Sequence, residues 1–230
     1  MPNIVILIPA HNEAASIGKV LRDIRRQVDH PVVVIDDASE DDTIAVARDA
    51  GAQVLPLAAH LGAWGAMQTG IRHALRQGYD YAVTMDADGQ HQARYLSRLI
   101  EPVVLETADV TIGAYPSRGS QPRKLAWSVL RRLSGLKMED ITSGFRGYNR
   151  RAMALLAQRG ATLLEYQDIG VLALLCRHNL RLLEVPVNMG PRHDGHSRVY
   201  RSWAMVAYYM AYSLILGASK RCRLTTVAPS

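Results

Sequence analysis

Cysteine and long apolar runs are both scarce in this chain of 230 residues. The two cysteines, Cys176 and Cys222, have no metal-ligand spacing and no cysteine-rich context that would indicate a disulfide framework. The N-terminal stretch MPNIVILIPAHNE has an apolar run of only about six residues and no preceding basic residues, so it predicts a first buried strand and not a secretion signal. We therefore expect a reducing compartment.

One segment, Trp203–Ala218, is apolar enough to raise the question of a membrane. As an α-helix it would be about 24 Å long, shorter than the roughly 30 Å hydrocarbon core of a bilayer, so we do not expect it to span one. Basic residues flank it on both sides, which suits a helix at the level of the lipid headgroups. A packing or dimerisation helix of a soluble protein is the alternative. The flanking residues are Arg198, Arg201, Lys220, Arg221 and Arg223.

Internal repeats and low-complexity linkers are absent, and 48% hydrophobic residues suffice for one sizeable core. Apolar runs of strand length recur, and the first four alternate with amphipathic helical patterns, which predicts parallel βαβ units. The expected strands are 4–8, 32–35, 53–57, 81–85, 110–112 and 182–187, and the expected helices are 14–27, 41–50, 63–77 and about 166–178. This pattern predicts an α/β fold with an open, mostly parallel sheet flanked by helices.

Polar residues and glycines mark the ends of the first predicted helices. Side-chain oxygens before a helix cap its free N–H groups, and glycine after a helix ends it. The expected caps are Asn12, Glu13, Ser39, Asp41 and Asp42, and the expected stops are Gly51 and Gly78. Further along, the stretch TSGFRGYNRRAM, residues 142–153, is expected to form a turn.

The loops that leave three of the predicted strands are all polar and acidic: PAHNE, DDASEDD and DADGQH. In an open parallel sheet, loops at the carboxyl ends of the strands build the ligand crevice, so these three predict one site. Asp86 and Asp88 can face a single divalent cation, and oxygen ligands suit Mg²⁺ or Mn²⁺, which would hold a diphosphate. Helix capping is the alternative for an isolated D-x-D. A carboxylate of Asp36 or Asp37 could accept hydrogen bonds from a ribose or a base.

The positive charge of the chain is local. The net charge is +6, and six basic residues without an acidic one lie between Pro116 and Lys137, so the remainder sums to about zero. Local basicity indicates a partner, whereas an ordinary solvated helix face is the alternative. The six are Arg118, Arg123, Lys124, Arg131, Arg132 and Lys137.

Five ordered motifs, IPAHNE, VIDDASEDDT, MDADGQH, TSGFRGYNR and EVPVNMGPRHDGHSR, resemble glycosyltransferase family 2. The closest similarity is to its polyprenyl-phosphate, or dolichyl-phosphate mannose synthase-like, sugar transferases, and it spans about Ile4 to Arg198. The resemblance implies a GT-A fold, a nucleotide-sugar donor, a divalent metal and inversion at the anomeric carbon. Residues 1–200 would form the GT-A domain, with a nucleotide-sugar half at 1–113 and an acceptor half at 114–200, followed by an apolar helix and basic tail at 201–230.

Matched position by position, the resemblance also implies the donor site. Asp88 and Gln90 match metal ligands, and Asp86 matches a residue near the donor sugar and the metal. His11 stands where the family usually has tyrosine, which leaves uridine and guanosine both open, and His91 has no assigned role. The implied nucleotide-sugar residues are Pro9, Ala10, His11, Glu13, Ile35, Asp37, Asp86, Ala87, Asp88, Arg192 and Arg198.

On the acceptor side, Arg118, Arg123 and Ser143 match the arrangement that receives the lipid phosphate in the polyprenyl-phosphate enzymes. Arginine suits this role because it binds phosphate through two parallel hydrogen bonds. Asp168 stands near the position of the catalytic acidic residue, with capping of the helix near Ile169 as the alternative. The implied catalytic residues are Asp168, Asp86 and Arg192.

We therefore expect transfer of a single sugar from a UDP- or GDP-sugar to a polyprenyl phosphate, by a cytoplasmic protein held peripherally on the inner face of the membrane. The Q-x-x-R-W element of processive polysaccharide synthases is absent. A saccharide hydroxyl acceptor in cell-surface polysaccharide synthesis is one alternative, and a non-catalytic nucleotide-binding scaffold is another. A homodimer or a small membrane-protein partner is compatible with the sequence, and nucleic acid is not an expected partner.

Overall fold

The computed structural model describes residues 2–115, 140, 143–162 and 169–190. Its centre is a seven-stranded mixed sheet in the order β3-β2-β1-β4-β6-β5-β7. All six predicted strands are present, so the predicted α/β fold is confirmed. The strands are β1 (Ile4–Ala10), β2 (Val32–Asp36), β3 (Gln53–Pro56), β4 (Tyr81–Thr84), β5 (Val110–Ala114), β6 (Arg146–Asn149) and β7 (Leu182–Pro186).

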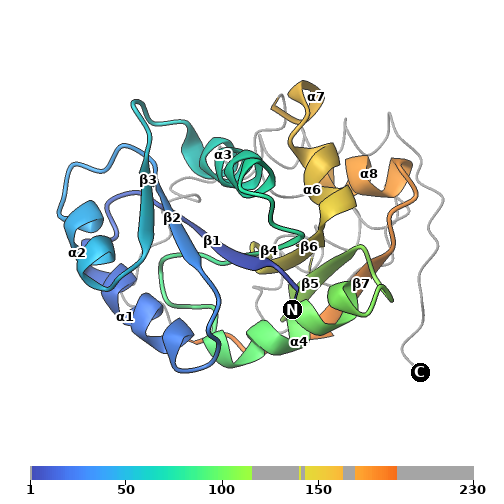
Figure 1. Ribbon diagram of the computed structural model, residues 1–230, viewed down its shortest axis with the longest axis horizontal. Helices are drawn as coiled ribbons and strands as arrows, with labels where there is room; N and C mark the ends of the chain where they lie inside the picture. Colours follow the sequence, from blue (N-terminus) through green and yellow to red (C-terminus); the bar gives the residue numbers. More distant parts are fainter. Residues whose placement is uncertain (1, 116–139, 141–142, 163–168, 191–230) are drawn as a thin grey trace, which may run out of the picture.

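Helices cover both faces of the sheet (Figure 1). On one face lie α1 (Ala14–Arg25), α2 (Thr43–Asp49) and α4 (Leu96–Val104), and on the other lie α3 (Gly62–Arg76), α6 (Arg150–Leu156) and α8 (Ile169–Arg177). The short helices η1 (Ala93–Tyr95) and α7 (Arg159–Thr162) precede α4 and follow α6. Successive residues of a strand point to opposite faces, so β1 supplies Val5 and Leu7 to one core and Ile6 and Ile8 to the other.

The predicted caps act between loops instead of within single helices. Asp41 accepts hydrogen bonds from the backbone N–H of Ala14 at 3.1 Å and of Thr43 at 3.0 Å, so one carboxylate serves the start of both α1 and α2. The backbone N–H of Asn12 donates to Ser39 Oγ at 2.9 Å, and that of Glu13 donates to Thr43 Oγ1 at 2.8 Å. These bonds join the loop after β1 to the loop after β2.

The predicted helix stops have the backbone geometry that favours glycine. Gly51 follows α2 with φ of 79°, and Gly78 follows α3 with φ of 81°. Both stops are confirmed.

The prediction of a turn over 142–153 is wrong. Arg146–Asn149 forms β6, which pairs antiparallel with both β4 and β5, and Asn149 Oδ1 caps α6 by accepting from the N–H of Ala152 at 2.9 Å. The sequence RGYN does not predict a strand, because Tyr148 is its one large apolar residue. Gly147 is required there: a Cβ atom would lie 2.8 Å from the carbonyl oxygen of Leu99 in α4.

At the opposite edge of the sheet from the three acidic loops, Asp109 joins three strands. The carboxylate accepts from the backbone N–H of Arg181 before β7 at 2.7 Å, from Arg181 Nε at 3.2 Å, and from Asn149 Nδ2 of β6 at 2.8 Å. Burial opposes ionisation of this group, but the hydrogen bonds from Arg181 and Asn149 outweigh it and lower the pKa of Asp109.

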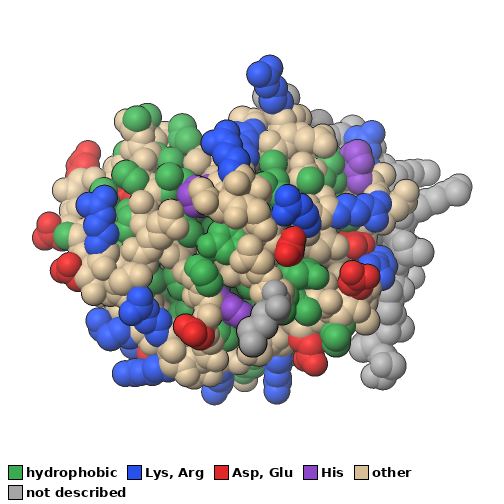
Figure 2. All heavy atoms as spheres, in the orientation of Figure 1, with side chains coloured by type: hydrophobic (Ala, Val, Ile, Leu, Met, Phe, Trp, Pro, Cys, Tyr) green, Lys and Arg blue, Asp and Glu red, His purple; other side chains and the backbone are tan. Residues whose placement is uncertain are grey.

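Within the described residues, no helix has the length and apolar character needed to cross a bilayer. The segment 203–218 lies outside them. On the face shown in Figure 2, Lys and Arg side chains are interspersed with Asp and Glu among the described atoms.

Candidate functional site

Three polar loops lie side by side at one edge of the sheet. β1 pairs in parallel with β2 on one side and with β4 on the other, so the carboxyl ends of all three strands reach the same edge. The structure therefore brings together PAHNE, DDASEDD and DADGQH, as the sequence led us to expect.

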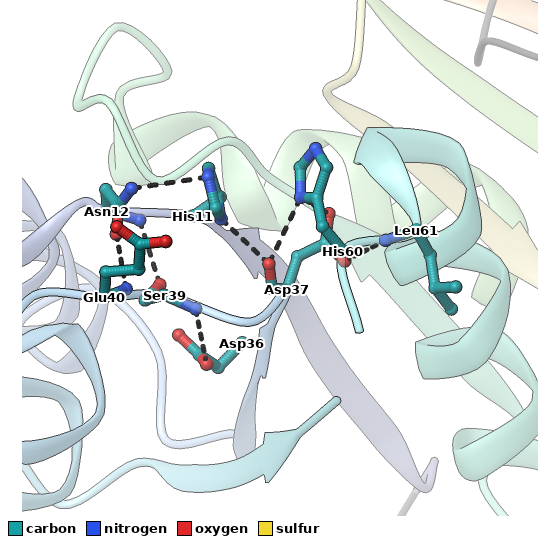
Figure 3. A network of polar contacts seen from close by, with 8 residues as sticks. All are labelled: His11, Asn12, Asp36, Asp37, Ser39, Glu40, His60 and Leu61. Carbon is teal, nitrogen blue, oxygen red and sulfur yellow. Dashed lines mark hydrogen bonds and ion pairs between the residues drawn. The ribbon is translucent and has the colours of Figure 1, made fainter. Parts of the chain in front are cut away.

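Asp37 is the centre of a polar cluster with two histidines, shown in Figure 3. His11 Nδ1 lies 2.8 Å from the carbonyl oxygen of Asp37, and His60 Nδ1 lies 3.2 Å from the same oxygen and 2.9 Å from Asp37 Oδ2. The backbone N–H of Leu61 donates to Asp37 Oδ1 at 2.7 Å. The two imidazole centroids are 4.3 Å apart, so the rings form a paired surface.

The surroundings of His11 assign its tautomer. Asn12 Nδ2 lies 3.3 Å from His11 Nε2, and an amide nitrogen can only donate, so Nε2 accepts. The ring proton is then on Nδ1 and points at the carbonyl oxygen of Asp37. Both ring nitrogens of His11 are therefore engaged within the protein.

The carboxylate of Asp36 lies apart from this cluster, because successive strand residues face opposite sides of the sheet. It accepts from the N–H of Ser39 at 3.2 Å through Oδ2, and it is 1% exposed. Oδ1 has no hydrogen-bond partner among the described residues. Of the two aspartates considered for a ribose or base, Asp37 is the one that faces the histidine pair.

Several of the predicted nucleotide-sugar residues are core residues at the ends of the strands. Ile35, Ala10 and Ala87 are buried at 0%, 3% and 4% exposure, and Ile35 packs beneath Gly70 of α3, where a Cβ atom would approach it to 2.7 Å. Pro9 lies beside Ile35 in the register of β1 and β2. The Glu13 carboxylate accepts from Ser16 Oγ at 2.7 Å. Pro9, Ala10, Ile35 and Ala87 therefore contribute packing more than polar groups.

The loop after β4 is shaped by its own polar contacts. Asp88 Oδ1 accepts from the N–H of Gln90 at 3.0 Å, and Gly89 between them has φ of 77°, a conformation that favours glycine. Asp88 is 8% exposed as a residue, whereas the side chain of Asp86 is 40% exposed. Asp86 is thus the more accessible of the two carboxylates.

The oxygen atoms of this loop suit a hard divalent cation whose coordination shell is completed by a bound substrate. In the described part of the chain, no three His, Cys, Asp or Glu side chains converge as a metal-binding group. Asp86, Asp88 and the amide oxygen of Gln90 are oxygen donors only. Mg²⁺ is commonly held by one or two carboxylates together with substrate phosphates, so this set suits Mg²⁺ or Mn²⁺ bound with a diphosphate.

Residues 5–156, which contain all three loops and β6, match the profile of glycosyl transferase family 2. The chain belongs to this family. It is accordingly a glycosyltransferase.

Among its relatives, the undecaprenyl-phosphate mannosyltransferase of Micrococcus luteus is 32% identical over 213 residues, covering 85% of this chain and 87% of the relative. The UDP-N-acetylglucosamine–dolichyl-phosphate N-acetylglucosaminyltransferase of Methanococcus voltae is 23% identical over 244 residues, covering 93% and 95%. Both names describe sugar transfer to a polyprenyl-type phosphate.

The solved structures confirm the GT-A fold of this family 2 member. Glucosyl-3-phosphoglycerate synthase of Mycobacterium tuberculosis, crystallised with Mn²⁺, UDP and glucosyl-3-phosphoglycerate, superposes with a TM-score of 0.70. The two chains are 20% identical, and the match covers 96% of this chain and 80% of that one.

The segment before β6, which contains the predicted acceptor residue Ser143, lies against the Asp86–Gln90 loop: a Cβ atom on Gly144 would lie 2.8 Å from Asp86 Oδ1. Ser143 is 1% exposed, and its Oγ accepts from the N–H of Phe145 at 3.3 Å. The carbonyl oxygen of the next residue, Gly144, accepts from Thr84 Oγ1 of β4 at 2.7 Å. Five other predicted site residues lie outside the described residues: Arg118, Arg123, Asp168, Arg192 and Arg198.

Sequence reasoning did not identify His60 or Gly144 at this candidate site, and it assigned no role to His91. His60 stands two residues before Gly62, which begins α3 with φ of 77°. This position could have indicated His60 from the sequence, because a residue just before a helix, at the carboxyl ends of the strands, is placed to face the site. Gly144 approaches Asp86 through its backbone and His91 through its ring, and sequence spacing reveals neither contact.

Proposed function

We propose that this family 2 enzyme transfers a single sugar from a UDP- or GDP-sugar to a polyprenyl phosphate, with inversion and with the help of Mg²⁺ or Mn²⁺. The observation that carries the donor half is the meeting of the His11–Asp37–His60 cluster with the Asp86–Gln90 loop at one sheet edge. The acceptor half is supported by relatives that cover at least 85% of the chain and are named for polyprenyl-type phosphates.

In this proposal the nucleoside lies against the paired histidine surface, over Pro9, Ala10 and Ile35. Stacking on an imidazole tolerates either base, so the site suits uridine and guanosine alike. The diphosphate extends toward Asp86, Asp88 and Gln90, which would hold the cation. The bound cation would stabilise the negative charge that builds up on the leaving diphosphate.

The transfer itself makes one bond and breaks one. An oxygen of the acceptor phosphate forms a bond to the anomeric carbon as the bond from that carbon to the diphosphate oxygen breaks, and the electron pair leaves with the nucleoside diphosphate. A phosphate acceptor is already an anion, so no general base is required. Asp86 orients the sugar, Arg192 and Arg198 contact the leaving diphosphate, and Asp168 is available as the acidic residue for a hydroxyl acceptor.

The lipid phosphate would be received by Arg118 and Arg123, with the turn of Ser143 beside the metal loop. Arginine pairs give both charge and geometry for a phosphate. The basic flanks of Trp203–Ala218 would hold the enzyme on an anionic, cytoplasmic membrane surface. This acceptor assignment makes the enzyme peripheral, with its substrate delivered by the bilayer.

A donor and acceptor screen tests the proposal. The full chain is incubated with UDP- and GDP-sugars and Mn²⁺ or Mg²⁺, with undecaprenyl phosphate in detergent or with soluble saccharides, and products are identified by mass spectrometry. We expect metal-dependent transfer to the lipid phosphate only, and an at least 100-fold loss of rate in Asp88→Asn.

The matched control is Asp80→Asn, a half-exposed aspartate paired with Arg150 at 3.6 Å on the surface. It should transfer at the wild-type rate. Transfer to saccharides with undecaprenyl phosphate left untouched would overturn the acceptor assignment, and full activity of Asp88→Asn would overturn the metal assignment.

A further inference from the structure

His91 is buried directly beneath the more accessible carboxylate of the metal loop. Its Nδ1 lies 3.1 Å from the backbone nitrogen of Asp86, and its Nε2 lies 3.6 Å from Asp86 Oδ2. The residue is 3% exposed. One imidazole ring thus faces both the main chain and the side chain of the same aspartate.

The contacts assign the neutral ring a single tautomer. A backbone N–H can only donate, so Nδ1 of His91 accepts and the ring proton is on Nε2. Nε2 lies 3.6 Å from Asp86 Oδ2, which is too far for a hydrogen bond, and it has no hydrogen-bond partner within the described residues. A buried donor without a partner is unfavourable, which favours any movement of the carboxylate toward it.

Gly144 limits the carboxylate from another direction. A Cβ atom built on Gly144 would lie 2.8 Å from Asp86 Oδ1. The backbone at Gly144 therefore lies so close to Asp86 that a residue with a side chain would not fit without a shift. Between the ring of His91 and the backbone of Gly144, the orientations open to the carboxylate are restricted.

His91 is itself anchored on two sides. Its ring stacks on Phe145 with centroids 5.0 Å apart and an angle of 16° between the planes. Its backbone forms a bridge with Met189, and the N–H of Gly190 donates to the carbonyl oxygen of Gln90 at 2.9 Å. The ring is therefore held by the turn before β6 and by the chain after β7.

Packing alone does not hold the loop in place. A cavity of about 380 Å³ adjoins it, and the lining includes Gly89, His91 and Gly190 together with Lys19 and Val20 of α1. Because this side of the loop borders a pocket, its polar contacts contribute to its shape. One of these contacts, the hydrogen bond from the N–H of Asp86 to His91 Nδ1, lies in the same residue as the Asp86 carboxylate.

We propose that His91 is a positioning residue that fixes the main chain and carboxylate of Asp86 for the metal-bound diphosphate of the donor. This inference rests on the proposed function for its ligand. Partners in the shell behind a metal ligand typically change metal affinity or activity by about 10- to 100-fold when they are removed.

Two substitutions separate the polar role of the ring from its packing. His91→Phe keeps an aromatic ring on Phe145 and loses both nitrogens. His91→Asn places an amide oxygen near the position of Nδ1 and so keeps an acceptor for the N–H of Asp86. The matched control is His73→Asn in the last turn of α3, at the opposite edge of the sheet.

The main readout is the affinity for UDP and GDP, measured by calorimetry with and without Mn²⁺, beside the electron paramagnetic resonance signal of bound Mn²⁺. We expect Kd with Mn²⁺ to rise about tenfold or more in His91→Phe and about threefold in His91→Asn, with no change in His73→Asn. The loss in His91→Phe should be in Mn²⁺-dependent affinity and kcat. Unchanged Mn²⁺-dependent affinity in a folded His91→Phe would overturn the inference.

A second measurement does not depend on the function. The ¹⁵N shifts of the His91 ring in the wild-type chain report its tautomer, and we expect the proton on Nε2. A proton on Nδ1 would overturn the inference even if the enzyme is active. Wild-type protein that binds neither nucleotide with Mn²⁺, but has the expected tautomer, would count against the proposed function and leave the Asp86–His91 contact supported.

Discussion

Asp37 contacts His11 through its backbone carbonyl oxygen, and it contacts His60 through both that oxygen and its carboxylate. The carbonyl oxygen holds His11, whereas Oδ2 holds His60, whose side chain is 58% exposed. His60 is therefore the part of the cluster that a ligand can reach and displace. The family resemblance implied Asp37 and His11, and the strand exits left Asp36 and Asp37 both open, but the sequence did not predict His60, because the contact depends on how α3 begins.

Removal of His60 tests this arrangement at the residue scale. We expect His60→Ala to raise Kd for UDP or GDP about three- to tenfold, because the carboxylate of Asp37 loses one of its two partners and the histidine surface loses one ring. The free energy of unfolding should change by less than about 0.5–1 kcal/mol, because the side chain is largely exposed. His178→Ala, at an exposed position after α8, is the control. Unchanged nucleotide affinity in His60→Ala would show that this histidine does not contact the nucleoside.

At the scale of elements, the first half of the chain was predictable and the second half was less so. The runs of β1, β2, β3 and β4 alternate with amphipathic helices, so local periodicity alone defines them. β6 was missed because its pairing with β4 joins residues far apart in sequence and its letters are mostly polar or glycine. Its stability comes from neighbours such as Asp109, which no local pattern identifies.

Asp109→Asn tests the tie between β5, β6 and β7. We expect the free energy of unfolding at pH 7 to fall by about 1–3 kcal/mol, because Arg181 loses a buried carboxylate partner. The pKa of Asp109 is lowered in the folded protein, so the stabilisation is present above the unfolded pKa and is lost as the pH falls through the folded pKa. The difference between wild type and variant should therefore shrink as the pH is lowered from 7 to about 3.

Urea denaturation at several pH values measures this difference. Asp80→Asn serves as the control, because the ion pair of Asp80 with Arg150 is half exposed and such pairs contribute little. A difference between wild type and Asp109→Asn that stays constant from pH 7 to 3 would contradict the role assigned to the charge.

At the scale of the whole molecule, the fold and the position of the site followed from the sequence, whereas the details of the site did not. Parallel pairing of β1 with β2 and β4 places three acidic loops at one edge, and the order of the runs is enough to predict that. Ring tautomers, backbone approach at Gly144 and the paired histidines depend on distances that no spacing encodes. The proposed membrane segment 203–218 and, of the proposed acceptor residues, Arg118 and Arg123 lie outside the described part of the chain.

The proposed membrane association is tested on the full chain with vesicles. We expect the protein to sediment with vesicles rich in phosphatidylglycerol, less so at high salt, and weakly with phosphatidylcholine alone. Replacing Lys220, Arg221 and Arg223 by glutamine should weaken the partition about a hundredfold, at roughly 1 kcal/mol for each basic residue. Replacing Arg150, Arg151 and Arg177 instead is the control. Equal loss in both triple variants would argue against a specific role for the C-terminal flank.

The shared capping by Asp41 has a consequence for changing the donor preference of this enzyme. Because the loops after β1 and β2 satisfy each other's backbone groups, one loop grafted alone from another enzyme would leave N–H groups of its neighbour unbonded. Ala38, which has φ of 56°, adds a constraint on the second loop. The two loops therefore form one exchangeable unit, and a graft meant to change the proposed nucleoside site has to carry both.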